Sequence, residues 1–170
     1  MGHELEWRQP EVLSRFYQLT DNGREIATLR FESSCGSLAT GECGQARWTF
    51  KRTGFLSPKI SVREAGLRDQ HRAIHARLDG QRLGGLLFRP ALSLAAHEFR
   101  GTEWAFEAED GTAAIALSGN RGFFKQGGTD TVTQSAAGLP ETPVMLLLIW
   151  YLRVPMNEDA SAGAAVAACS

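Results

Sequence analysis

The stretch that decides the fold is Pro143-Val-Met-Leu-Leu-Leu-Ile-Trp-Tyr-Leu-Arg-Val154. It follows Thr142, a residue type that favours helix N-caps, it opens with proline at the first helical position, and it meets Pro155. These signals predict one helix over residues 143–154. Because large apolar side chains occupy every face of this helix, we expect it to be buried on all sides. Its length of about 18 Å is well short of the ~30 Å that a membrane span requires.

The chain before this segment has the pattern of short β-strands. Apolar and polar residues alternate in the runs 47–51, 59–63 and 103–107, which is the period of half-buried strands. Turn-forming groups such as Asp21-Asn22-Gly23 and Asp79-Gly80 separate the runs. The spacing predicts roughly a dozen strands in an antiparallel meander.

A helix without a polar face needs an enclosure, and this requirement favours a closed sheet. A barrel of eight strands is filled by its own side chains, so enclosing a helix takes about 11–12 strands. We therefore predict a mainly β fold: a closed antiparallel barrel of about 12 strands around the C-terminal helix, with residues 1–155 as a single domain. The alternative is a β-sandwich with the helix across one open end. The small, nearly featureless residues 156–170 predict a disordered tail.

The charge is distributed unevenly along the 170 residues. The chain has 18 basic and 19 acidic side chains, for a formal net charge of −1, which argues against a general nucleic-acid binder. Residues 47–82, however, hold nine basic side chains against three acidic ones. The near-neutral total therefore leaves room for a local basic patch.

The strand meander and the closing helix, Pro143-Val-Met-Leu-Leu-Leu-Ile-Trp-Tyr-Leu152, resemble the tubby C-terminal-like superfamily over residues 5–154. This superfamily includes the tubby proteins, the plant LURP-one-related proteins and the phospholipid scramblases; the chain looks like a bacterial-type member. The resemblance implies a 12-stranded barrel around a central hydrophobic helix. It also implies contact with phosphoinositide or other anionic phospholipid headgroups through basic side chains.

Strand alternation selects the residues that could make such a contact. With Trp48 and Phe50 facing inward, Arg47 and Lys51 face outward, and the same argument on residues 59–64 turns Lys59 and Arg63 outward. We predict these four cations as the lipid- or anion-binding residues: Arg47, Lys51, Lys59 and Arg63. The alternative interpretation is an ordinary solvated face.

Motifs for other chemistry are weak. Cys35 and Cys43 are too far apart for a zinc knuckle, even with His71 and His75 as further ligand types. Gly36-Ser-Leu-Ala-Thr-Gly41 has P-loop glycine spacing, but an acid follows it where lysine must bind phosphate. We expect no metal, no cofactor and no catalytic residues. A calcium loop and a spanning segment after the barrel are also missing, which argues against scramblase activity.

Three functions remain open from the sequence. The first is a non-enzymatic binding module whose partner is an anionic membrane lipid or an acidic protein surface. The second is a structural or protein-interaction domain with no lipid ligand, and the third is an enzyme with an unidentified site. An odd number of cysteines and the lack of an apolar leader predict a cytoplasmic protein, peripheral to the membrane if it binds lipid.

Overall fold

A computed structural model describes residues 2–34, 36–54, 59–65, 74–79, 82–84, 93–96, 103–107, 112–121 and 126–168. Within these ranges the fold is mainly β and antiparallel, as predicted. The first six strands are β1 (His3–Arg8), β2 (Phe16–Asp21), β3 (Arg24–Phe31), β4 (Ala39–Cys43), β5 (Ala46–Thr53) and β6 (Lys59–Glu64). The next six are β7 (Ile74–Asp79), β8 (Arg82–Gly84), β9 (Ser93–Ala96), β10 (Glu103–Glu107), β11 (Ala113–Arg121) and β12 (Gln126–Val132). Two helices follow, α1 (Gln134–Ala137) and α2 (Thr142–Ala168).

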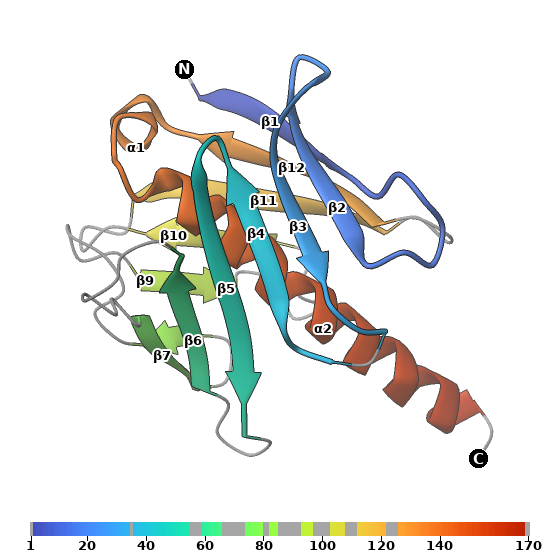
Figure 1. Cartoon of the computed structure of the whole chain (residues 1–170). Helices are drawn as coiled ribbons and strands as arrows, with labels where there is room; N and C mark the ends of the chain where they lie inside the picture. Colours follow the sequence, from blue (N-terminus) through green and yellow to red (C-terminus); the bar gives the residue numbers. More distant parts are fainter. Residues whose placement is uncertain are drawn as a thin grey trace.

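Each strand pairs with its neighbours in the sequence, and the sheet closes where the first strand meets the last. β1 pairs antiparallel with β12 on one side and with β2 on the other. The order is therefore a meander that returns on itself as a closed barrel (Figure 1). Closure removes the exposed sheet edges on which aggregation begins.

Local turn chemistry explains the connection between β2 and β3. The two residues between these strands are Asn22 and Gly23, with φ angles of 48° and 81°. Both central residues of a tight hairpin turn of this kind need positive φ, which asparagine tolerates and glycine adopts freely. The turn predicted at residues 21–23 is confirmed.

The interior of the barrel is occupied by the first half of α2. Every residue from Val144 to Val154 is buried, and α2 contacts β3, β4 and β5 on one side and β10 on the other (Figure 1). Aromatic rings join the helix to the wall: Trp150 stacks on Trp7 with centroids 5.0 Å apart, and Tyr151 stacks on Phe50 at 5.3 Å. Such pairs add about 0.5–1.5 kcal/mol each to the burial of their surface.

Two glycines on neighbouring strands make room for the largest side chains of α2. Gly119 and Gly128 lie directly opposite each other in the register of β11 and β12. A Cβ atom at Gly128 would lie 3.0 Å from the Trp150 ring, and one at Gly119 would collide with the guanidinium of Arg153. The two glycines therefore leave space inside the barrel wall for the side chains of Trp150 and Arg153.

The helix differs from the prediction at both ends. Thr142 is its first residue and not its cap, and the Thr142 hydroxyl donates a hydrogen bond to the Ala136 carbonyl. At the other end the helix does not stop at Pro155 but continues to Ala168. The predicted limits of 143–154, and the predicted disorder of the tail over 156–168, are therefore wrong; residues 169–170 lie outside the described ranges.

Helix beyond Pro155 has a physical explanation. A proline inside a helix removes one backbone donor at a cost of ~3 kcal/mol. The following segment is rich in alanine, the residue type with the highest helix propensity, which favours continuation. Arg15 also holds Glu158 in an ion pair of 2.9 Å, one turn past the proline.

Candidate functional site

The four predicted cations lie on adjacent strands of the barrel wall. Arg47 and Lys51 belong to β5, and Lys59 and Arg63 belong to β6. The predicted alternation is confirmed on both strands: Trp48, Phe50, Ile60 and Val62 are buried, while the four cations are exposed. The sequence therefore places these cations on the outer face of β5 and β6, named here the basic face.

The register of the two strands determines how the cations lie relative to one another. Lys51 is directly opposite Ser61, so Lys59 and Arg63 are both its diagonal neighbours. Diagonal positions across an antiparallel pair are about 7–8 Å apart, within reach of long side chains. Lys51, Lys59 and Arg63 can therefore surround one anionic group.

Arg47 lies at the edge of this arrangement and already has a partner. Its guanidinium is 2.6 Å from Oε1 of Glu42, which is directly opposite it on β4. Both side chains are largely exposed, so the pair contributes little to stability. It does neutralise part of the positive charge, which makes Arg47 a weaker candidate than the other three.

The register also adds a position that the sequence prediction did not select. Arg77 on β7 is opposite Lys59 in the register, and His75, two residues earlier, is opposite Ser61. The sequence alone could not select Arg77, because its pairing with Lys59 is known only once the register of β6 and β7 is known. Arg77 therefore extends the row of basic positions from β6 to β7.

A second polar group lies inside the barrel and was missed. Asp130 on β12 is fully buried and accepts a hydrogen bond of 2.7 Å from the indole Nε1 of Trp7. Burial raises the pKa of Asp130 to about 8, although the Trp7 hydrogen bond and the charge of Arg153 oppose the shift. Arg153 is also fully buried, with its Cζ 4.5 Å from the centroid of the Trp150 ring. These groups have no exposed surface, so we assign them to the core.

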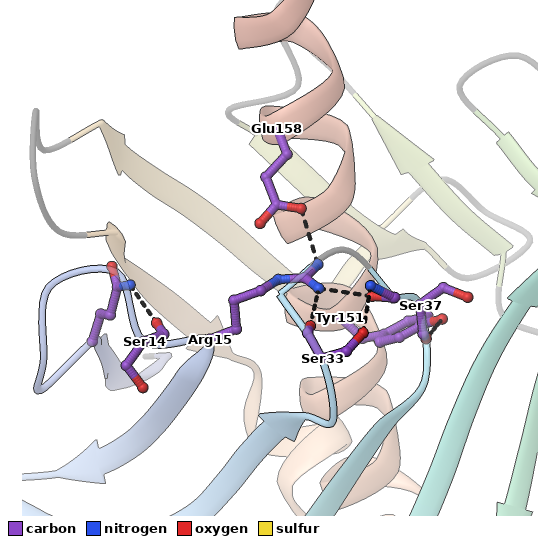
Figure 2. A network of polar contacts seen from close by, with 8 residues as sticks. Ser14, Arg15, Ser33, Ser37, Tyr151 and Glu158 are labelled. Atoms are coloured by element: carbon purple, nitrogen blue, oxygen red, sulfur yellow. Dashed lines mark hydrogen bonds and ion pairs between the residues drawn. The ribbon is translucent and has the colours of Figure 1, made fainter.

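A third polar network lies where α2 leaves the barrel (Figure 2). Arg15 donates hydrogen bonds to the carbonyls of Ser33 (2.8 Å) and Gly36 (2.7 Å), and pairs with Glu158. Nearby, the Tyr151 hydroxyl donates to the Ser37 carbonyl at 2.6 Å. This network, named here the Arg15 clasp, connects the loop between β3 and β4 to α2. We assign it a role in stability.

Among the described residues, no cluster of three histidine, cysteine or acidic side chains could hold a metal ion. Of the ligand types considered above, Cys35 and His71 lie outside the described residues. In the part of the chain that the structure describes, no helix combines the length and apolarity of a membrane span.

Comparisons of the chain with known proteins found no match. No protein-family model matches the chain, and neither does any curated protein or solved structure.

Proposed function

We propose that the protein is a non-enzymatic binding module that contacts anionic phospholipid headgroups, including phosphoinositides, through the basic face. The observation that carries the proposal is the diagonal placement of Lys59 and Arg63 on either side of Lys51. Arginine donates paired hydrogen bonds to phosphate oxygens, and lysine acts as a mobile point charge. The three side chains together supply both kinds of contact on an exposed surface.

Electrostatics supports a membrane surface as the partner. Each lysine or arginine near an anionic leaflet contributes about 1 kcal/mol, so three or four cations on one face give measurable attraction. The proposed location is the cytoplasmic side of a membrane, with the protein bound peripherally. Because these cations lie on paired strands, their backbone is already ordered and binding does not require a loop to become ordered.

The proposal includes the fold type. We infer that the barrel with a buried C-terminal helix is the tubby C-terminal-like architecture, because a twelve-strand meander is followed by a helix whose first half is buried. The residues of the basic face are assigned by their position in this chain. They are not matched one by one to lipid contacts in that superfamily.

Co-sedimentation with vesicles tests the proposal. Vesicles of phosphatidylcholine with phosphatidylserine or a phosphoinositide should bind the protein, and pure phosphatidylcholine should not. The double variant Lys51→Glu with Lys59→Glu should lower binding at least ~30-fold, since two contributions of about 1 kcal/mol are lost and two repulsions are added. Binding should also weaken as salt rises.

A matched control shows whether binding is lost because these residues form a site or only because the net charge of the protein changes. Arg8→Glu with Arg24→Glu changes the net charge equally, at two exposed positions on β1 and β3 away from the basic face. The control should keep most of the binding. Equal losses in both double variants, or binding that is the same on neutral vesicles, would overturn the proposal in favour of a domain without a lipid site.

A further inference from the structure

A cavity of about 280 Å³ lies against α1 and the start of α2, at the end of the barrel where α2 begins. Its walls come from the first four strands, from β12, from both helices and from the connection between them. It lies among elements other than β5 and β6, so it is separate from the basic face. The cavity is therefore a second feature that needs its own explanation.

The walls of the cavity are apolar. Leu5, Leu19, Val132 and Leu146 line it, and each of these side chains is buried in the barrel core. An apolar cavity of ~150 Å³ takes up benzene, so an apolar space of about 280 Å³ has room for a larger hydrocarbon group. Burial raises the pKa of the Cys43 thiol, which lines the same space and stays uncharged at neutral pH. The walls thus favour a hydrocarbon chain over a charged molecule.

Polar groups lie at one edge of the cavity. Nε2 of His3 is 3.2 Å from Oδ2 of Asp21, and both side chains are partly exposed. The side-chain amide of Asn22 donates to Oδ1 of Asp21 at 2.8 Å. The Asp21 carboxylate is held at this edge, where it accepts hydrogen bonds and repels other anions. A ligand that fits both the walls and the edge has a hydrocarbon chain and an end that donates a hydrogen bond and carries no negative charge.

We propose that this cavity binds a small amphiphile, a hydrocarbon chain of roughly eight carbons or a branched equivalent, with a hydroxyl end that faces Asp21. The chain contacts the buried leucines and Val132, and the hydroxyl donates to the carboxylate. This site is independent of lipid headgroup binding on the basic face, and either one can fail without the other.

Methyl NMR with 1-octanol as the probe tests the site on the full chain. Saturable shifts are expected at the methyl groups of Leu5, Leu19, Val132 and Leu146, which line the cavity. Octanoate should bind at least ~10-fold more weakly than 1-octanol, because its carboxylate meets Asp21. Methyl resonances that do not change at saturating octanol, or octanoate that binds as tightly, would overturn the proposal.

Two substitutions on α1 provide a blocked form and its control. Ala137 lines the cavity and is exposed, so Ala137→Phe adds a ring at the mouth without disturbing the core. Gln134 is exposed on the same helix and does not line the cavity, so Gln134→Phe adds the same ring elsewhere. Ala137→Phe should lower octanol affinity ~10-fold or more, and Gln134→Phe should leave it unchanged. Equal affinity in the two variants would rule out this cavity as the binding site.

Discussion

The end of the barrel where α2 enters is lined by apolar side chains around a cavity, whereas charged groups are built into the part through which the helix leaves. At the entry, Leu5, Leu19 and Leu146 surround open space. Toward the exit, Arg153 is buried beside Trp150, and Arg15 binds two carbonyls and Glu158. The difference indicates that the exit is fastened by directional bonds, while the entry keeps space that a ligand can fill.

The largest effect is expected in the middle of α2, on which both ends depend. Leu147 is fully buried, and Leu147→Asp would place a charge in the barrel interior. We expect a loss of at least ~4 kcal/mol in the free energy of unfolding, a large part of the ~5–15 kcal/mol that stabilises a typical domain. Chemical denaturation or circular dichroism measures the loss.

Leu13→Asp is the matched control for this substitution, because Leu13 is 92% exposed. Its stability should stay within ~0.5 kcal/mol of the parent. A cooperative unfolding transition of Leu147→Asp near that of the control would mean that the helix does not hold the barrel together.

The next effect compares the two ends directly. Arg15→Ala removes two hydrogen bonds to carbonyls and the ion pair with Glu158, from a side chain that is only 10% exposed. It should lower the free energy of unfolding by about 2–4 kcal/mol. His3→Ala at the entry breaks an exposed pair with Asp21 and should cost about 0–1 kcal/mol. Urea denaturation of both variants would show the asymmetry, and equal losses would contradict it.

The last effect depends on pH and concerns the buried carboxyl of Asp130. Because the folded pKa of Asp130 is raised to about 8 from 3.8, the folded state keeps a proton that the unfolded state releases between these values. The stability that this group contributes is therefore complete below pH ~4 and is lost as the pH rises toward 8.

Asp130→Asn tests this pH dependence, since its amide oxygen can still accept from the Trp7 indole. Denaturation midpoints measured from pH 5 to 8 should decline less steeply with pH in the variant than in the parent. Parallel pH profiles would show that Asp130 is ionised in the folded protein.

Much of the local structure followed from the sequence, and particular residues show why. Alternation on 47–51 and 59–63 correctly turned Trp48, Phe50, Ile60 and Val62 inward and the four cations outward. Period-two patterns report directly on which face of a strand is buried. The end of the helix was predicted wrongly because a proline signal is local, while the clasp that holds Glu158 comes from Arg15, far away in the chain.

The sequence by itself determined that the protein is mainly β, which residues of β5 face outward, and that residues 144–154 must be buried. These properties depend on neighbours within a few positions along the chain. Only the tertiary structure decided that Lys59 and Arg63 are the diagonal neighbours of Lys51. The same is true of the ion pair between Glu42 and Arg47 and of the hydrogen bond from Trp7 to Asp130 in the core. Such relations depend on strand register and barrel closure, which join residues distant in sequence and leave no periodic pattern in it.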